Sequence, residues 1–274
     1  MYPQAFIVQM CSTMSAEQNF NYLQQQLTNA QLSKPTLVCL SETWLCFNKD
    51  GATTLEQSKS NHLWVEKLAQ LCRQFNIWLA AGTIALPSEN TGKYYAASLL
   101  FNEQGEVVAQ YNKIHLFDAQ VQDGSGGYRE SKFTQAGNDV VVVDSPFGRI
   151  GLSVCYDVRF AGLYQKMMAL GADIILVPSA FTTVTGKAHW LPLLQARAIE
   201  TQCYVLAAAQ VGQHDNGRAT YGHSVAISPW GEVLANAKTE LTNIECQLDL
   251  SELQQVRASL PVHQHNRFKS TFYE

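Results

Sequence analysis

The sequence predicts an α/β protein with two stacked sheets and helices on their outer faces. Short β-rich runs alternate with amphipathic helical stretches for most of the 274 residues, which is the pattern of a layered α/β domain. Only some connections between strands contain a helix, which disfavours one doubly wound parallel sheet. No Pro-rich, Ser-rich or charge-dense linker divides the chain. We therefore expect one domain over residues 1–250, with a C-terminal tail at 251–274 that belongs to the same unit.

The first part of the chain supplies five expected strands and two expected helices. The strands are predicted at Ala5–Met10, Thr36–Ser41, Ile77–Ala85, Tyr94–Asn102 and Val107–Asn112. Helices are predicted from the Ser15 cap to about Leu32 and over Leu63–Phe75, because apolar side chains recur there at the spacing of one helical face. Gly105 lies in the short connection between the last two strands, which predicts a local antiparallel hairpin.

The second part continues the alternation after a Gly-rich loop at residues 124–127. Strands are predicted at Val140–Val143, Ile150–Val154, Ile174–Val177, Tyr204–Ala209, Val225–Ile227 and Glu232–Ala235. Turns containing Pro and Gly join the first two and the last two of these strands. Helices are predicted near Leu163–Leu170 and over about His189–Gln202.

The charge of the chain and its N-terminal sequence indicate which partners and which compartment to expect. The formal net charge is −4 and the charges are dispersed, so no basic face is offered to a nucleic acid or to an anionic membrane. The N-terminus carries no basic region followed by an apolar stretch, and no apolar run approaches the length that spans a membrane. We expect a cytoplasmic protein.

Cysteine usage argues against structural crosslinks. The chain has seven cysteines, an odd number, and no CxxC pair. This disfavours a disulfide framework and a zinc site, so no metal is expected. Most of these cysteines lie in apolar runs, where a thiol behaves as a small hydrophobe.

Cys155 is the cysteine whose surroundings favour a reactive thiol. It lies where the apolar strand Ile150–Val154 runs into polar residues and then a helix. A strand end that opens onto a helix N-terminus exposes a side chain and offers unpaired backbone N–H groups. Such groups can lower a thiol pKa and bind an oxyanion. Cys46 is also near a strand end, but its setting is less clear.

A cysteine nucleophile needs a group that accepts its proton, and histidine is the usual partner. None of the seven histidines is marked by its spacing, so a Cys-His pair stays open. Glu42 follows the strand Thr36–Ser41 as Cys155 follows its own strand, and Lys113 follows Val107–Asn112. A buried glutamate would have a raised pKa that suits a general base. Taken singly, a solvated glutamate and a surface lysine are also compatible with these positions.

Three separated motifs of the chain resemble those of the nitrilase superfamily of carbon-nitrogen hydrolases. Leu40–Glu42 is similar to its glutamate motif, Tyr111–Asp118 to its lysine motif and Gly151–Phe160 to its cysteine motif. The resemblance runs from Ala5 to about Leu250. It implies that residues 1–250 form a carbon-nitrogen hydrolase domain, folded as a four-layer αββα sandwich that pairs across a helical face into a homodimer. The tail is expected to pack against the partner subunit.

The resemblance also implies the roles of the site residues. Glu42 would be the base, Cys155 the covalent nucleophile, and Lys113 the oxyanion support together with the backbone N–H of Tyr156. Glu130 is similar to a second family glutamate that orients the substrate and steadies the lysine. No metal or organic cofactor is implied.

Further segments resemble the amidase branch that hydrolyses deaminated glutathione to 2-oxoglutarate and cysteinylglycine. These segments are Pro178–Thr182, Thr185–Trp190, Arg197–Val205, Ala207–His214 and Tyr221–Ser224. The expected partner is therefore a small amide that bears a carboxylate. The resemblance implies substrate-binding positions at Tyr156, Arg159, Ala180, Phe181 and Thr182.

A substrate carboxylate needs a cationic partner. Arg159, four residues beyond Cys155, is our first choice for bidentate recognition. Lys187 and Arg218 are the alternatives. A structural ion pair is an equally good interpretation of Arg159 alone.

Other functions remain open beside this hypothesis. An omega-amidase that releases ammonia from 2-oxoglutaramate or 2-oxosuccinamate would share the triad. A non-catalytic binding protein with the same fold is disfavoured by the intact triad, and a nitrile hydrolase by the branch motifs. Ser41, Ala161–Leu163 and Lys187 depart from the habits of the amidase branch, as does the Gly-rich segment Asp123–Gly127. These departures leave the detail of the substrate open.

Overall fold

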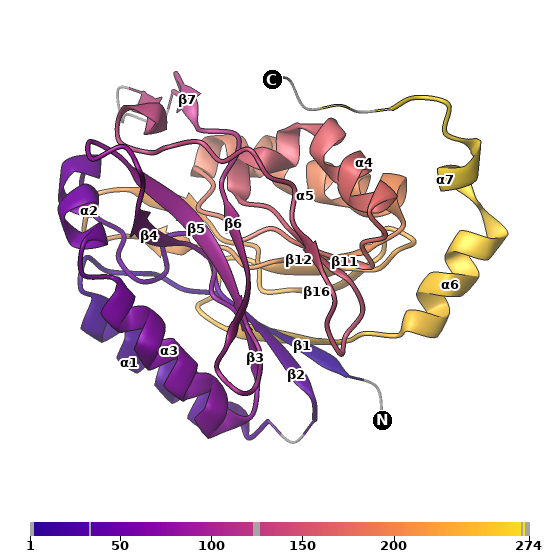
Figure 1. Ribbon diagram of the computed structural model, residues 1–274, viewed down its shortest axis with the longest axis horizontal. Helices are drawn as coiled ribbons and strands as arrows, with labels where there is room; N and C mark the ends of the chain where they lie inside the picture. Colours follow the sequence, from indigo (N-terminus) through magenta and orange to yellow (C-terminus); the bar gives the residue numbers. More distant parts are fainter. Residues whose placement is uncertain (1–2, 33, 123–126, 270, 272–274) are drawn as a thin grey trace.

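Two β-sheets lie face to face between two layers of helices in the computed structural model (Figure 1). The structure describes residues 3–32, 34–122, 127–269 and 271. The expected four-layer αββα sandwich is confirmed. The expected Gly-rich loop at 124–127 lies outside the described residues except for Gly127.

The first sheet has the strand order β17-β1-β2-β3-β5-β4, with β6 paired to β5. Strands β1, β2 and β3 run parallel, whereas β17, β4 and β6 pair antiparallel with their neighbours. The strands are β1 (Gln4–Val8), β2 (Thr36–Cys39), β3 (Trp78–Ala80), β4 (Ile84–Pro87), β5 (Tyr94–Phe101), β6 (Val107–Asn112) and β17 (Asn243–Gln247).

The second sheet has the order β16-β15-β12-β11-β10-β9, with β10, β11 and β12 parallel. Its strands are β9 (Val142–Val143), β10 (Ile150–Leu152), β11 (Ile174–Leu176), β12 (Tyr204–Ala207), β15 (Val225–Ile227) and β16 (Val233–Asn236). Two short hairpins complete the β-structure: β7 (Asp118–Ala119) with β8 (Tyr128–Arg129), and β13 (Val211–Gln213) with β14 (Ala219–Tyr221).

The side chains of β1 alternate between the two faces of the first sheet, and both faces are buried. Ala5 and Ile7 belong to the core cluster between the sheets, while Phe6 and Val8 belong to the cluster under the helices. Successive side chains of a strand point to opposite faces, so a strand that is apolar at every position fits an inner layer of a four-layer sandwich.

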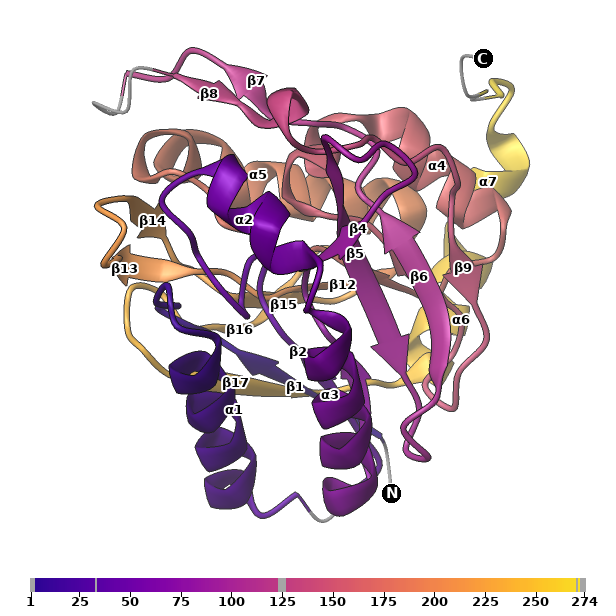
Figure 2. The ribbon, with the colours of Figure 1, turned by 60° about the vertical axis from the view of Figure 1, so that its left-hand side comes forward.

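The helices cover the two outer faces (Figure 2). On the first sheet lie α1 (Ala16–Ala30) and α3 (His62–Phe75), and on the second lie α4 (Ala161–Ala169) and α5 (Thr183–Thr201). The remaining helices are α2 (Gly51–Ser58), α6 (Leu250–Ser259), α7 (Val262–His265) and the 3-10 helices η1 (Glu130–Lys132) and η2 (Cys155–Arg159). The predicted Ser15 cap is present, because its side chain accepts from the Gln18 N–H. No described helix has both the length and the apolar character needed to cross a membrane.

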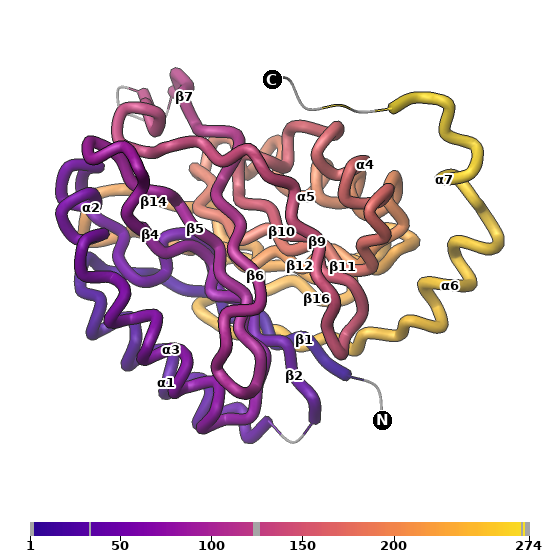
Figure 3. The backbone as a smooth tube through the Cα atoms, viewed as in Figure 1, coloured from indigo at the N-terminus to yellow at the C-terminus, as the bar shows by residue number. Residues whose placement is uncertain are grey.

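The C-terminal segment follows a separate path. Figure 3 shows the chain leaving β17 and running along the outside of the sandwich as α6 and α7. Leu253 is the buried side chain of α6, and α7 buries none. Phe268, beyond α7, is 88% exposed. Most of this segment therefore contributes little to the core.

The predicted strand Ile77–Ala85 is wrong, since it is two strands, β3 and β4, on different sides of β5. Gly82 separates them with a left-handed φ of 51°. A Cβ at Gly82 would collide with the backbone oxygen of Ser41. The chain therefore bends where it passes the residue before Glu42, a tertiary contact that strand periodicity does not reveal.

Other elements were missed or shortened by the sequence analysis. Helix α2, the hairpin β13-β14 and β17 were not predicted, and α5 begins at Thr183 rather than near His189. Asp50 caps α2 and Thr182 caps α5 by accepting backbone N–H groups three residues on. The caps were present in the sequence, but the short helix α2 and the first turns of α5 show no clear apolar face.

Replacing Gly82 by alanine is expected to lower the free energy of unfolding by about 2 to 4 kcal/mol, because a left-handed residue gains a Cβ against backbone. Gly92→Ala is the matched control. Its added Cβ meets only the Asn90 side chain at 3.5 Å, and a change within about 0.5 kcal/mol is expected. Urea denaturation measures both, and equal stability of the two variants would contradict the proposed constraint.

Candidate active site

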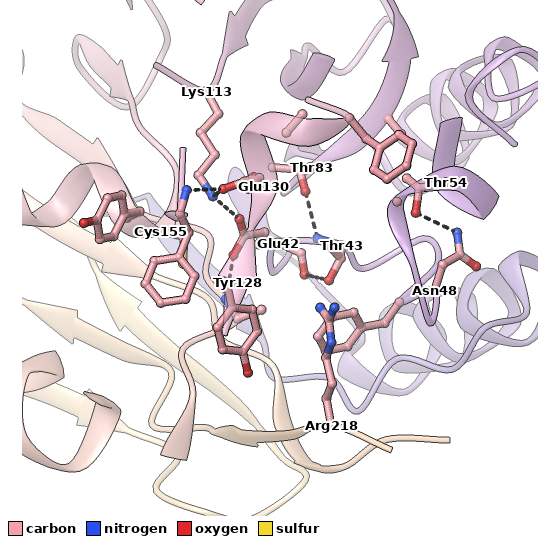
Figure 4. A pocket seen from close by; sticks show the side chains of 18 of the residues that line it. Glu42, Thr43, Asn48, Thr54, Thr83, Lys113, Tyr128, Glu130, Cys155 and Arg218 are labelled. Carbon is pink, nitrogen blue, oxygen red and sulfur yellow. Dashed lines mark hydrogen bonds and ion pairs between the residues drawn. The ribbon is translucent and has the colours of Figure 1, made fainter. Parts of the chain in front are cut away.

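Three strand ends meet at one end of the sandwich. Glu42 follows β2 and Lys113 follows β6 in the first sheet, and Cys155 follows β10 in the second. All three side chains are buried or nearly so. The two facing sheets therefore bring residues from distant parts of the sequence into one cluster (Figure 4).

Lys113 is the centre of this cluster. Its Nζ donates to Glu42 Oε1 at 2.8 Å and to the two Glu130 carboxylate oxygens at 3.0 and 2.9 Å. Its side chain is only 2% exposed. Burial alone disfavours the ammonium, but the charges of Glu130 and Glu42 outweigh it and hold the pKa of Lys113 well above its usual value. The lysine is therefore a fixed cation between two carboxylates.

Glu42 is held in place by donors on several sides. Its Oε2 accepts from the Ala180 N–H at 2.9 Å, and its backbone oxygen accepts from Gln210 Nε2 at 3.0 Å. The charge of the Glu42 carboxylate also acts on the nearby Cys155 thiol and raises its pKa. One carboxylate thus binds the lysine and lies beside the thiol in the same pocket, as a proton acceptor for the thiol must.

Glu130 approaches from the β7-β8 region. It is the first residue of η1, and its Oε2 accepts from the Phe117 N–H at 2.6 Å as well as from Lys113. Burial raises the pKa of Glu130 above its usual value, with the Lys113 charge opposing that effect. Glu130 therefore links the β7-β8 hairpin to Lys113.

Cys155 has an uncommon backbone conformation for a residue with a side chain. Its φ is 48°, its N–H donates to the Pro178 oxygen at 2.9 Å, and it begins η2. Left-handed non-glycine residues are often found at active sites. Within the described residues no acceptor is found for the N–H of the next residue, Tyr156. That N–H is therefore free to bind a developing oxyanion beside the thiol.

Asp157 holds the lysine segment against the cysteine segment. This fully buried carboxylate accepts from the Val154 N–H and the Tyr111 hydroxyl through Oδ2, at 2.8 and 2.7 Å. Its Oδ1 contacts the N–H and the ring Nδ1 of His115, at 3.0 and 2.7 Å. Because Tyr111 and His115 flank Lys113, Asp157 fixes the distance between the two motifs.

The Cys155 thiol lies in an environment that disfavours its anion. Burial raises the pKa of Cys155 well above its usual value, the Glu42 carboxylate raises it further, and Lys113 lowers it. The lowering that a helix start can give does not outweigh these effects. At neutral pH the thiol is therefore protonated, and a base must take its proton during attack.

A pocket of about 270 Å³ opens in front of the cluster. All nine predicted site residues line it: Glu42, Lys113, Glu130, Cys155, Tyr156, Arg159, Ala180, Phe181 and Thr182. The sequence analysis missed others, including Phe47, Asn48 and Tyr128. These come from loops and a two-residue strand with no motif, so no local pattern could have marked them.

Two of the three candidate cations reach this pocket. Arg159 lines it with its guanidinium 5.4 Å from the centroid of the Phe181 ring and 3.2 Å from His189 Nδ1. Arg218 also lines it. Lys187 is exposed on α5 and is not among the lining residues. No carboxylate partner of Arg159 or Arg218 is found in the described ranges.

Histidine does not complete the site. All seven histidines are described, and none lines the pocket. His115 is bound to Asp157, and His214 to Ser12 and Thr220. Apart from the masked positions, no group of three or more His, Cys, Asp or Glu side chains is arranged to hold a metal ion. The Cys-His pair left open by the sequence thus has no histidine at the thiol.

Replacing Glu42 by glutamine is expected to lower the pKa of the Cys155 thiol, since a charge that opposes the thiolate is removed while Lys113 remains. Turnover should fall at the same time by roughly two to four orders of magnitude, because the base is lost. The pH profile of Cys155 alkylation by iodoacetamide, read by peptide mass spectrometry, measures the shift. Cys46 in the same pocket is the internal reference. An inflection at or above the wild-type pH would contradict this electrostatic interpretation.

Residues 5–258 match the family model described as carbon-nitrogen hydrolase. A deaminated glutathione amidase of Yersinia enterocolitica is 40% identical over 268 residues, which cover 97% of this chain and 93% of that protein. The similarity spans every residue of the cluster described above.

Solved structures show the same fold. The Caenorhabditis elegans NitFhit protein superposes with a TM-score of 0.92 at 36% identity, over 99% of this chain and 67% of that chain. Saccharomyces cerevisiae Nit3, a member of branch 10 of the nitrilase superfamily, has a TM-score of 0.84 at 27% identity, over 97% and 96% of the two chains.

Proposed function

The chain belongs to the carbon-nitrogen hydrolase family, and on that premise we propose that it hydrolyses deaminated glutathione to 2-oxoglutarate and cysteinylglycine. The observation that carries the proposal is the cluster at the wall of one pocket, where Glu42 accepts a hydrogen bond from Lys113 and its charge acts on the Cys155 thiol. The name of the Yersinia enterocolitica relative supports the choice of amide.

In the first half-reaction Glu42 accepts the thiol proton as Cys155 Sγ attacks the amide carbonyl carbon. The carbonyl oxygen becomes an oxyanion that the Lys113 ammonium and the Tyr156 N–H stabilise. Glu42 then transfers its proton to the nitrogen, the C–N bond breaks, and cysteinylglycine leaves as the amine. A 2-oxoglutaryl thioester remains on Cys155.

In the second half-reaction a water molecule attacks the thioester carbonyl while Glu42 accepts one of its protons. The same two donors stabilise the second oxyanion. The C–S bond breaks, 2-oxoglutarate departs, and the proton on Glu42 returns to the sulfur. Each group of the cluster thus acts twice, and Glu130 keeps Lys113 charged and in place through both halves.

The acyl half of the substrate needs recognition near the thiol. Arg159 is four residues from Cys155 on η2, and its guanidinium lies over the Tyr156 and Phe181 rings at 5.7 and 5.4 Å. We assign the 2-oxo acid carboxylate to Arg159, while Ala180, Phe181 and Thr182 form the adjoining wall of the pocket.

Parallel assays of deaminated glutathione and 2-oxoglutaramate test this function. Both share the acyl group, and they differ in the amine that leaves. A higher kcat/KM for deaminated glutathione supports the proposal. A clear preference for 2-oxoglutaramate would instead identify an omega-amidase, and no hydrolysis of either would exclude both.

We also propose that the protein is a cytoplasmic homodimer in which the tail, residues 251–274, contacts the partner. Leu260 and Phe268 expose large apolar side chains, at 48% and 88%, on a segment that runs outside the sandwich. Such surfaces favour association. Light scattering of a variant ending at Leu260 should report a smaller particle than the full chain, and an unchanged mass would contradict a role for the tail.

A further inference from the structure

We propose that Arg218 binds the terminal carboxylate of the leaving cysteinylglycine and so selects amides whose amine is a peptide. This inference rests on the proposed function and extends it to the second half of the substrate. Arg218 lies between β13 and β14, a hairpin that no catalytic motif includes. Deaminated glutathione carries one carboxylate on each side of the scissile bond, so two separate cations are needed to hold both.

The charges of the pocket leave Arg159 and Arg218 as the candidate partners for the two substrate carboxylates. The catalytic cluster contains two carboxylates, Glu42 and Glu130, against one ammonium, Lys113. Because the thiol is neutral, these three groups offer no net positive charge to an anionic substrate. Arg159 and Arg218 are half-buried cations on the same pocket, and neither has a carboxylate partner among residues that the structure describes.

Arg218 is held by the protein in a position that faces the pocket. Its guanidinium carbon lies 5.5 Å from the Phe47 ring centroid and 5.6 Å from the Tyr128 ring centroid. Both rings belong to pocket-lining residues. Cation–π contacts of this kind orient a guanidinium and leave its N–H groups free for an anion.

The backbone around Arg218 is fixed as well. Its N–H donates to Asn216 Oδ1 at 2.8 Å, and its oxygen accepts from the His214 N–H at 2.8 Å. Asn216 Nδ2 in turn donates to the Phe47 oxygen at 2.7 Å. The hairpin is thereby tied to the loop that supplies one of the two rings, so little ordering is required when a ligand binds.

Position assigns Arg218 to the leaving group rather than to the acyl group. Arg159 lies on the same 3-10 helix as Cys155, whereas Arg218 comes from a separate hairpin. Figure 4 shows Arg218 entering the pocket between Tyr128 and Asn48, from a different side than Cys155 and Lys113. Two extended residues span about 7 Å, so the cysteinylglycine carboxylate is carried well away from the thiol, toward that part of the pocket.

The test is a cycle of two enzymes and two substrates. Wild type and Arg218→Gln are assayed on deaminated glutathione and on the same compound with its terminal carboxylate converted to a carboxamide. Wild type should prefer the carboxylate by roughly 10- to 100-fold in kcat/KM, the range of one charge-assisted hydrogen-bonded pair. In Arg218→Gln that preference should vanish, because the two changes remove the same contact.

Two further variants serve as controls for the loss of the Arg218 charge. Lys187→Gln removes an exposed cation outside the pocket and should retain the wild-type preference. Arg218→Lys keeps the positive charge over the rings and should show an intermediate preference. A full preference in Arg218→Gln, or no preference in wild type, would overturn the inference. Failure of the proposed function appears differently, as a wild type that hydrolyses neither form of deaminated glutathione.

Discussion

Replacing Cys155 by alanine is expected to lower kcat on the amide substrate by about four to six orders of magnitude, the scale on which removal of a covalent nucleophile acts. The fold should survive, because the thiol occupies little volume, and Glu42 and Lys113, whose charges act on it, remain paired with each other. Stopped assays that detect both the acid and the released amine measure the loss.

Cys46→Ala is the matched control for this prediction. Cys46 is a second thiol on the same pocket, and Gln57 Nε2 donates to its sulfur at 2.8 Å. We expect its removal to leave kcat within about threefold of wild type, since the hydrogen bond that it accepts comes from Gln57 and not from a group of the catalytic cluster. Comparable losses in the two variants, or appreciable activity in purified Cys155→Ala, would contradict a covalent mechanism through Cys155.

Replacing Lys113 by alanine is expected to harm both turnover and folding. Loss of an oxyanion donor should lower kcat by at least roughly two orders of magnitude. Two buried carboxylates, Glu42 and Glu130, would be left without their shared cation, and the free energy of unfolding should fall by about 3 to 5 kcal/mol. Urea denaturation and steady-state kinetics measure the two effects separately.

The pH dependence of the stability of Lys113→Ala tests whether unpaired carboxylates cause the loss. Burial and the Glu42 charge raise the pKa of Glu130, and without the Lys113 ammonium nothing opposes them, so the pKa of Glu130 in the folded state rises further above that of the unfolded chain. Such groups destabilise the folded protein as pH rises. The stability deficit against wild type should therefore shrink as the solution is acidified. Lys132→Ala, which removes an exposed cation from η1, should show no such trend, and a pH-independent deficit would contradict the electrostatic explanation.

The layered fold followed from patterns that are local in sequence. The Ser15 cap and the one-sided apolar spacing predicted α1, and apolar runs predicted β1, β2, β10 and β11 because these strands are buried on both faces. The break at Gly82 was not predictable in this way. It depends on the approach of the Ser41 backbone, which only the folded chain supplies.

The cluster was predictable as a set of strand ends, but its electrostatics were not. The motifs placed Glu42, Lys113 and Cys155 after strands, and the structure brings them together. A helix start can lower a thiol pKa, but burial and the Glu42 carboxylate raise the pKa of this thiol. Burial depends on both sheets at once, so no single motif reveals it.

The wall of the pocket opposite the cluster was the least predictable part. Phe47, Tyr128 and Arg218 come from segments far apart in sequence, and the Arg218 guanidinium lies over both rings. Arg218 was one of three candidate cations on residue type alone. Its place in the pocket distinguishes it from Lys187.

The central claim is that Cys155 carries the acyl group during turnover. Rapid acid quenching of wild type with excess deaminated glutathione, followed by mass spectrometry of the peptides, tests it most directly. We predict a 2-oxoglutaryl adduct on the Cys155 peptide that forms and decays within the turnover time and is absent from Cys155→Ala. Steady turnover with no adduct on Cys155, or with an adduct on another residue, would contradict the mechanism.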